Sequence, residues 1–465
     1  MFYRLKEPYV FTGYKFLPFA IEAMDGEHYF DKPYFFKKNT FLRLLDCNGQ
    51  NDMEADKVIR ELVKIGVIEE SETRLEPLRD YQKYHVFKNK YMKSIHWSIT
   101  GRCNFKCRHC LMSASNGRHD ELSLEKCFNI IDQISECGIK RVDITGGEPL
   151  VRRDFEELVR YLSEKNIKIN LIFTNASLLN GEVLDMLERY RQKPAFQLSF
   201  DGLGHHDWLR GVKGAEREAD EAFKLLKERN YTVLAAMCIH KGNKDSLRDT
   251  INYLSDNGVK ALKVNAPQEL GVWKQYSDEF ALSHDEQVDI YTEYIPHYFE
   301  DGMPMDVEFE GYFKCSKGSY DYKIGYVHKD KNYNLDTLPY CESLQYNAYI
   351  SPEGRLVPCM GFADTVLQDK FPSIFDKPLW QQLNDSYYRE VAKATVGDLV
   401  RSCEKCRDCE YLRRCYGGCM LAGMDEKGNY LLPDENICRF FHSDYESRIR
   451  EAADNALKKY RKQEA

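Results

Sequence analysis

The middle of the chain alternates short apolar runs with segments whose apolar residues recur at helical spacing. Six runs rich in β-branched and aromatic residues have the composition of strands; these runs are Ile95–Thr100, Val142–Thr145, Ile169–Thr174, Phe196–Phe200, Val233–Ile239 and Ala261–Val264. The helical segments between them include Glu125–Cys137, Phe155–Lys165, Glu182–Arg191, Glu218–Arg229 and Ser246–Asn257. Strands that alternate with helices predict an α/β fold with a parallel sheet. We expect residues 93–267 to form a partial (β/α)6 barrel similar to a TIM barrel, with its chemistry at the C-terminal ends of the strands.

Residues 1–89 show a different pattern, rich in Tyr and Phe. Extended stretches at Tyr9–Tyr14 and His28–Phe36 precede two helical patterns, at Asn39–Leu45 and Glu54–Ile65. In both helical patterns the apolar residues fall near one face. The segment therefore predicts a small winged-helix-like module in front of the barrel.

The rest of the chain has three parts. Residues 268–308 form a bridging segment with a helical stretch at Asp285–Phe299, and residues 441–465 predict a charged helix with a solvated surface. Residues 309–440 contain turns, short strands and many cysteines, with little regular apolar periodicity. We expect metal cross-links to replace a conventional core there.

Composition narrows the class of protein. The 465 residues carry a net charge of −8 and the basic residues are dispersed, which argues against a nucleic-acid partner. No apolar run approaches the length of a bilayer span, so we expect no membrane partner and a cytoplasmic location. Sixteen cysteines without a secretory signal indicate metal or redox chemistry rather than disulfides.

Cys103, Cys107 and Cys110 place three thiols within eight residues, in the loop that follows the first predicted strand. Thiolates at this spacing suit zinc or iron–sulfur ligation. Zinc would need a fourth ligand, for which His109 is the nearby candidate. Three ligands to a four-iron cluster would instead leave one iron open to a small molecule.

The stretch Cys-Asn-Phe-Lys-Cys-Arg-His-Cys, from Cys103 to Cys110, resembles the cysteine motif of radical S-adenosylmethionine (SAM) enzymes. This resemblance implies that Cys103, Cys107 and Cys110 are the catalytic ligands of a [4Fe-4S] cluster whose open iron chelates SAM. It also implies cleavage of SAM to a 5'-deoxyadenosyl radical, and a reducing partner such as flavodoxin or ferredoxin. His109 occupies a position that varies in the family.

Further candidate SAM contacts follow the other strands. Thr145-Gly146-Gly147-Glu148-Pro149 is similar to the GGEP motif of the family: paired glycines permit close approach of the backbone, and Glu148 can accept from an ammonium. An ordinary turn is the alternative. The other candidates are Asn175, Ser199 and Asp201 for ribose hydroxyls and the methionine carboxylate, Arg210 for that carboxylate, and Asn265 for the adenine edge. Capping or turn roles are equally open for these residues.

The second cysteine region resembles the SPASM domain, which implies two auxiliary [4Fe-4S] clusters and therefore three clusters in all. By this resemblance the ligands of the outer cluster are Cys406, Cys409, Cys415 and Cys438, and those of the inner cluster are Cys341, Cys359 and Cys419. Cys315 is the candidate for the fourth inner ligand; if it is not bound, an open iron can accept a substrate thiolate. Cys403 is a possible alternative ligand, and a pair of zinc ribbons is the other reading.

SPASM proteins mostly modify peptides or proteins, so the resemblance implies a macromolecular substrate. Residues 1–89 look like the element that binds leader peptides of ribosomally made natural products, where a leader adds a strand to a sheet edge. A DNA-binding winged helix is the alternative, but the second helical pattern mixes acidic and basic residues. Sulfatase-maturing enzymes carry an aspartate where Met360 follows Cys359 here, which disfavours that activity.

We therefore expect a radical SAM enzyme that modifies a precursor peptide bound through its leader, forming a thioether between a cysteine sulfur and a carbon. Carbon–carbon cross-linking, epimerisation and a sulfatase-maturing-like activity are the enzymatic alternatives, as is action on a folded protein or a small metabolite. The alternative from another class is a zinc-stabilised interaction scaffold without catalysis.

Overall fold

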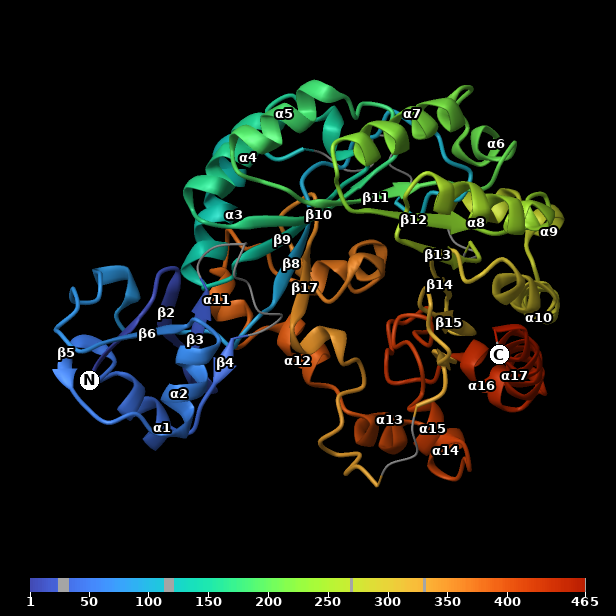
Figure 1. Ribbon diagram of the computed structural model, residues 1–465. Helices are drawn as coiled ribbons and strands as arrows, with labels where there is room; N and C mark the ends of the chain where they lie inside the picture. Colours follow the sequence, from blue (N-terminus) through green and yellow to red (C-terminus); the bar gives the residue numbers. More distant parts are fainter. Residues whose placement is uncertain (24–32, 113–120, 268–270, 329–331, 465) are drawn as a thin grey trace.

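A sheet of eleven strands dominates the computed structural model, which describes residues 1–23, 33–112, 121–267, 271–328 and 332–464 (Figure 1). The strand order is β16-β15-β14-β13-β12-β11-β10-β9-β8-β17-β18, and neighbouring strands run parallel from β17 through to β14. The strands are β8 (Ser94–Ser98), β9 (Arg141–Thr145), β10 (Lys168–Thr174), β11 (Ala195–Ser199), β12 (Val233–Cys238), β13 (Ala261–Asn265), β14 (Asp306–Phe309), β15 (Phe313–Cys315), β16 (Tyr322–Lys323), β17 (Asn347–Ile350) and β18 (Leu356–Val357).

Helices cover one side of this sheet (Figure 1). They are α3 (Leu124–Glu136), α4 (Phe155–Glu164), α5 (Gly181–Arg189), α6 (His206–Arg210), α7 (Ala215–Glu228) and α8 (Leu247–Asp256). In α3 the Ser123 hydroxyl accepts from the Lys126 amide and caps the first turn, while Ile130 and Ile134, one turn apart, are fully buried. The longer of these helices each have one buried and one solvated face, and this produces the helical spacing of apolar residues seen in the sequence.

The α/β class and the six predicted strands are confirmed, each strand within two residues of its predicted ends. The sheet is longer than six strands, however. β14 pairs in parallel with β13, and β17 pairs in parallel with β8, although both strands come from segments predicted to lie outside the barrel. Each has only four residues, and their partners lie far away in the sequence, so local periodicity could not assign them to this sheet.

The N-terminal segment forms two small sheets around its own core, with orders β5-β1-β6 and β4-β3-β2-β7. Its elements are β1 (Phe2–Leu5), β2 (Tyr9–Tyr14), β3 (Leu17–Ala23), β4 (Tyr34–Phe35), α1 (Lys38–Leu44), β5 (Asn48–Asp52), α2 (Lys57–Lys64), β6 (Ile68–Ser71) and β7 (His85–Phe87). α2 begins three residues later than predicted, because the Asp56 carboxylate accepts from the Ile59 amide and caps it. Part of the predicted extended stretch 28–36 lies outside the described residues.

The C-terminal region packs into the same hydrophobic core as the barrel, so the expectation that it lacks a conventional core is wrong. Tyr388, Leu399 and Phe440 are among its buried residues. They come from helices too short to show periodicity. The remaining helices of the chain are α9 (Ser277–Phe280), α10 (His284–Glu300), α11 (Leu379–Gln382), α12 (Tyr387–Lys393), α13 (Val396–Ser402), α14 (Glu404–Arg407), α15 (Leu412–Cys415), α16 (Glu435–Phe441) and α17 (Tyr445–Glu464).

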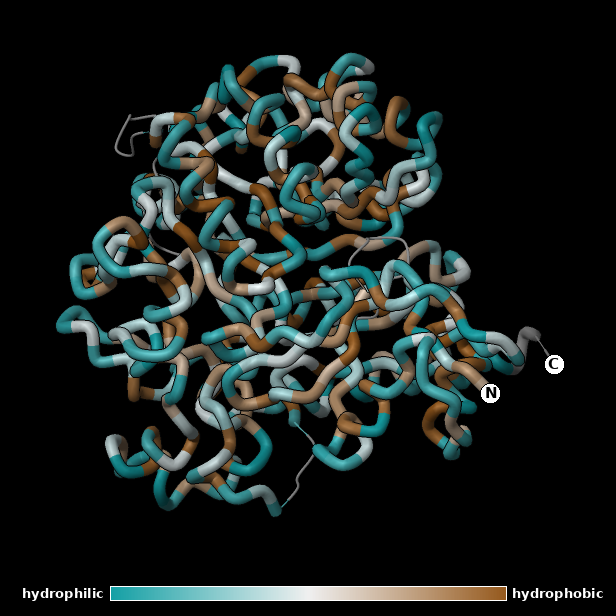
Figure 2. Tube along the Cα trace, turned by 90° about the vertical axis from the view of Figure 1, so that its left-hand side faces the viewer, coloured by the Kyte–Doolittle hydropathy of each residue, from teal (hydrophilic) through white to brown (hydrophobic). Residues whose placement is uncertain are grey.

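The last helix, α17, is less solvated than predicted. It packs against α10, with Ile449 and Ala453 fully buried. Hydrophobic and hydrophilic segments alternate along the coloured parts of the trace (Figure 2). Among the described residues, none of the helices combines the length and the apolar character that crossing a membrane requires.

Candidate functional site

The first cysteine loop follows β8 at the C-terminal edge of the parallel strands. Cys103, Cys107 and Cys110 are half-buried, and the Phe105 amide donates to Cys103 Sγ over 3.4 Å. Burial, together with the neighbouring thiols of Cys107 and Cys110, raises the pKa of Cys103 to about 12. Three thiolates this close together need a positive centre to stabilise them, and an iron–sulfur cluster supplies one.

The two glycines after β9 lie against the cysteine loop. A side chain on Gly147 would place its Cβ 2.2 Å from the Arg102 carbonyl oxygen, and one on Gly146 would place it 2.7 Å from that of Thr100. The Gly147 amide donates to the Thr100 carbonyl over 2.9 Å, which ties the two loops together. Gly146 and Gly147 therefore allow the two protein loops to pack closely against each other. That these glycines also contact SAM stays a prediction.

Glu148 is completely buried between these loops. Its carboxylate accepts from the Asn175 amide at 2.7 Å, the Thr174 hydroxyl at 2.8 Å and the Leu150 amide at 3.1 Å. Burial raises its pKa to about 7, although the three hydrogen bonds lower it. The Asn175 side chain in turn donates to Asn104 Oδ1 over 2.9 Å, so this network joins the ends of β9 and β10 to the cysteine loop.

Asp201 and Arg210 form a buried ion pair behind the loop. Arg210 Nε and Nη2 donate to the Asp201 carboxylate over 2.7 and 3.2 Å, and Arg210 Nη1 lies 3.9 Å from Cys107 Sγ. The Asp201 carboxylate also accepts from the Cys238 amide at 3.0 Å and lies 3.1 Å from His206 Nδ1. Burial alone would raise the pKa of Asp201, but Arg210 and His206 hold it well below its usual range.

Ser199 and Asn265 lie where predicted, at the C-terminal ends of β11 and β13. Ser199 is half-buried. The Asn265 amide group, in the orientation that satisfies its surroundings, donates to Glu310 Oε2 over 2.9 Å and to the Val264 carbonyl over 3.2 Å. The predicted contacts therefore share one edge of the sheet with the cysteine loop.

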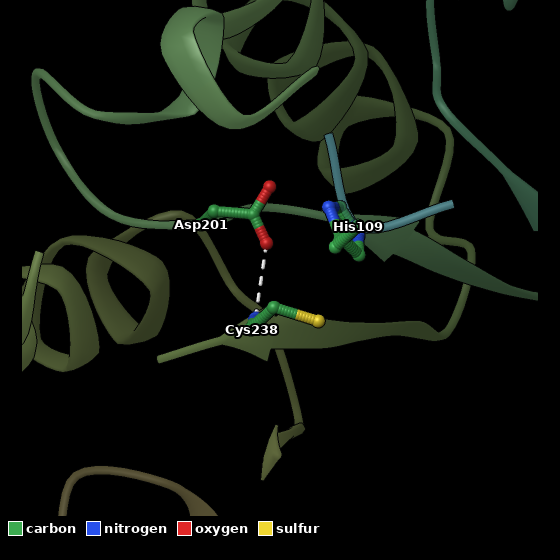
Figure 3. Close-up of side chains that lie close together, drawn as sticks. All are labelled: His109, Asp201 and Cys238. Atoms are coloured by element: carbon green, nitrogen blue, oxygen red, sulfur yellow. Dashed lines mark hydrogen bonds between the residues drawn. The ribbon is translucent and has the colours of Figure 1, made fainter. Parts of the chain in front are cut away.

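The structure adds Cys238 to this edge, beside His109 and Asp201 (Figure 3). The three side chains offer ligand atoms within 4.8 Å of one another. The Asp201 carboxylate is already held by Arg210 and by the Cys238 amide, however, so its charge is compensated without a metal ion. From the sequence Cys238 looks like a core cysteine; its place at the end of the fifth barrel strand is the signal that could have found it.

The second cysteine region separates into two groups. One cavity of about 30 Å³ is lined by Cys406, Cys409, Cys415 and Cys438, together with Tyr411 and Phe441. We call these four cysteines the outer group. Cys403 contacts Cys406 at the side of this group.

The inner group consists of Cys341, Cys359 and Cys419. Burial, together with the neighbouring thiols of Cys419 and Cys341, raises the pKa of Cys359 to about 11. Taken over all their atoms, Cys359 and Cys419 are nevertheless exposed residues.

Cys315 lies apart from these two groups. It sits on β15, is 2% exposed, and its sulfur faces the carbonyl oxygens of Ser316, Ser319 and Asp321 at 3.6 to 3.8 Å. In the part of the chain that the structure describes, no recorded contact joins it to another cysteine. The structure thus brings together four outer and three inner cysteines, and does not bring Cys315 to either group.

Comparison with known proteins identifies the class. Residues 97–254 match the Radical SAM superfamily, and residues 341–410 match SPASM, an iron-sulfur cluster-binding domain. The chain therefore contains a radical SAM domain and a SPASM domain. The two domains imply [4Fe-4S] clusters and SAM as cofactors, and the three cysteine groups fit them. A zinc-stabilised scaffold does not account for these matches.

Among its relatives is the antilisterial bacteriocin subtilosin biosynthesis protein AlbA of Bacillus subtilis, 26% identical over 75% of this chain and 72% of that protein. Another is an AdoMet-dependent heme synthase of Methanosarcina barkeri, 24% identical over 74% of this chain and 95% of that protein. The crystal structure of Streptococcus suis SuiB bound to S-adenosylmethionine superimposes with a TM-score of 0.62, at 17% identity, over 93% of this chain and 99% of that one. At this identity the likeness shows the fold alone.

Proposed function

We propose that this protein joins a cysteine sulfur to a carbon atom within a ribosomally synthesised precursor peptide. The observation that carries the proposal is the inner group, in which three cysteines lie together, two of them exposed, while Cys315 is held among backbone carbonyls. A four-iron cluster held by three protein thiolates keeps one iron free for a fourth ligand. A substrate cysteine is the natural ligand for that iron, because thiolates are the usual ligands of such clusters.

Two comparisons support a peptide substrate. AlbA is named for the biosynthesis of a bacteriocin, and SuiB has also been solved bound to its precursor peptide SuiA. The heme synthase relative points to small-molecule chemistry instead. The open inner group favours the peptide, because a cysteine-bearing substrate would use that iron.

SAM and the reduced first cluster supply, when bound, a radical that removes a hydrogen atom from the substrate carbon. The chain itself would hold the cluster through Cys103, Cys107 and Cys110. The residues proposed to contact SAM are Gly146, Gly147, Glu148, Asn175, Ser199, Asp201, Arg210 and Asn265. After donating to Asp201 and Cys107, Arg210 retains two of its five N–H groups for the carboxylate of SAM.

Residues 1–89 are proposed to bind the leader of the precursor, with β7 as the docking edge. β7 is the last strand in its sheet, and Val86 on it is 41% exposed. A cavity of about 310 Å³ adjoins this edge, lined by Thr12, Glu22 and His85 together with Lys140 of the barrel. An extended peptide paired with β7 would gain main-chain hydrogen bonds and place alternate side chains toward the cavity.

In the proposed thioether reaction the peptide is oxidised, SAM is the oxidant, and a reductant supplies the electron that starts the cleavage of SAM. Per cross-link, the substrate carbon and the cysteine thiol each lose one hydrogen; SAM takes one hydrogen atom, and one electron and one proton leave the peptide. The proton passes to solvent and the electron to an auxiliary cluster. Flavodoxin or ferredoxin is the proposed source of the electron that the first cluster consumes.

The test is anaerobic incubation of the reconstituted enzyme with SAM, reductant and cysteine-bearing peptides encoded beside its gene. A thioether product lacks two hydrogens and one alkylatable thiol. Loss of two hydrogens with the thiol retained would indicate a carbon–carbon bond, and exchange of deuterium from solvent without a net mass loss would indicate epimerisation; either outcome overturns the thioether. Cys419→Ala should abolish cross-linking while SAM cleavage persists, and Cys315→Ala is the matched control that should retain both.

A separate binding experiment tests the leader site. Val86→Asp should weaken leader binding to the full-length protein at least tenfold, measured by fluorescence anisotropy. Leu42, 48% exposed on α1, provides the control Leu42→Asp, which should bind normally. Equal binding by both variants would contradict the β7 site and leave the thioether proposal untouched.

A further inference from the structure

Arg210 is built into the cysteine loop more firmly than a free SAM ligand would be. It is the last residue of α6, and the preceding Leu209 carbonyl accepts from the Arg108 amide of the loop over 2.9 Å. Gly211, with φ of 68°, closes the helix against the loop, where a Cβ would lie 2.4 Å from the Lys106 carbonyl oxygen. The end of α6 therefore has a fixed position relative to Cys107.

The charges at this point are buried and opposed. Asp201 is fully buried and Arg210 is 8% exposed, so solvent screens neither charge strongly. The guanidinium reaches Cys107 Sγ at 3.9 Å, and the carboxylate is held on its other side by two hydrogen bonds. The Cys107 sulfur therefore has the positive guanidinium of Arg210 beside it, and the negative carboxylate of Asp201 lies beyond that guanidinium.

Net charge and hydrogen bonds to the sulfurs are among the factors that set the reduction potential of an iron–sulfur cluster. A positive donor at Cys107 stabilises the state with the additional electron, and a nearby carboxylate destabilises it. We propose that Arg210 is a positioning residue that raises the reduction potential of the cluster bound by Cys103, Cys107 and Cys110, and that Asp201 opposes it. The redox couple concerned is [4Fe-4S]²⁺/[4Fe-4S]⁺, in which the cluster accepts one electron. This inference goes beyond the proposed function, because it depends on the cluster and not on the substrate.

The test is a dithionite titration of the reconstituted holoprotein without SAM, followed by electron paramagnetic resonance. The signal of this cluster is identified by its absence in a variant with all three loop cysteines changed to Ala. Arg210→Gln should lower the potential and Asp201→Asn should raise it, each by at least a tenfold change in the reduction equilibrium, which is 59 mV for one electron. Arg210→Lys, which keeps the charge, should fall between wild type and Arg210→Gln.

Arg248 supplies the matched control, because it makes a similar two-point ion pair with Asp301, at 2.9 and 2.6 Å, away from the cysteines. Arg248→Gln should leave the potential unchanged. Shifts of the same sign in Arg210→Gln and Asp201→Asn, or a shift in only one of them, would overturn the proposal. If Arg210→Gln does not retain iron, Asp201→Asn decides alone: an unchanged or lowered potential rejects the role. None of these readouts uses a peptide, so they stand or fall independently of thioether formation.

Discussion

The inner and outer cysteine groups share one region of the chain and yet differ in access. The four outer cysteines are buried or half-buried and line a cavity of about 30 Å³ together with Tyr411 and Phe441, whereas two of the three inner cysteines are exposed. Four cysteine ligands shielded from solvent suit a cluster that only exchanges electrons. An incomplete set at an open surface suits a cluster that also binds another molecule. Differences in burial, more than in cysteine spacing, thus distinguish the two roles that we propose.

The largest expected difference is in stability. Cys415→Ala should cost about 3 kcal/mol and lower the midpoint of thermal unfolding by about 3 °C, because the outer group cross-links α14, α15 and α16. Cys419→Ala should remove its cluster with a smaller loss of stability. Differential scanning calorimetry with iron analysis checks both variants, and an equal loss in the two would remove the structural distinction.

The next effect concerns the rate of iron loss. An iron chelator should strip the inner cluster several times faster than the outer one, because Cys359 and Cys419 are more exposed residues than the four outer cysteines. The phases can be followed by the absorbance of the iron–chelator complex. Assignment comes from the variants: the fast phase should vanish in Cys419→Ala and the slow phase in Cys415→Ala. The reverse assignment would contradict the comparison.

A spectroscopic effect should follow from the open ligand position. Addition of a small thiol should change the electron paramagnetic resonance spectrum of wild-type protein, since a thiolate can bind the free iron of the inner cluster. A thioether of similar size should have no effect. The change should be missing in Cys419→Ala and retained in Cys415→Ala; a response that persists without the inner cluster would place the open iron elsewhere.

The smallest effect is expected at Cys315. Cys315→Ala should leave iron content unchanged and cost about 1 kcal/mol, because a small buried side chain is lost from β15. Iron analysis and denaturant unfolding measure the two quantities. A loss of about four irons would instead make Cys315 the fourth inner ligand and close the open position.

The sequence predicted those elements whose apolar periodicity is visible within a local stretch of the chain. The strands of the barrel alternate with helices over tens of residues, so their periodicity places them within two residues. β17 has four residues and finds its partner β8 about 250 positions away, and nothing in Asn347–Ile350 indicates this pairing. The packing of the C-terminal region was missed for the same reason.

The candidate site shows the same limit at the level of single residues. The spacing of Cys103, Cys107 and Cys110 indicated zinc or iron–sulfur ligation because all three share one loop, and the resemblance to radical SAM enzymes implied the cluster. That Asp201 holds Arg210, and that Cys238 lies beside His109, depends on how separate strand ends meet. Residue types alone left these side chains with several equivalent roles, and tertiary structure assigned their partners.

The pairing of β17 with β8 also has a consequence for the order of events during synthesis. β8 leads directly into the first cysteine loop, and one of its edges is completed only by residues 347–350. A growing chain that already contains the whole barrel segment therefore still has an unpaired edge beside its cysteine loop. Contacts of such long sequence separation form late and slowly. We therefore expect the cluster to be inserted into the loop only after most of the polypeptide has been synthesised. Folding of the C-terminal region would then be required before the first cluster site can mature.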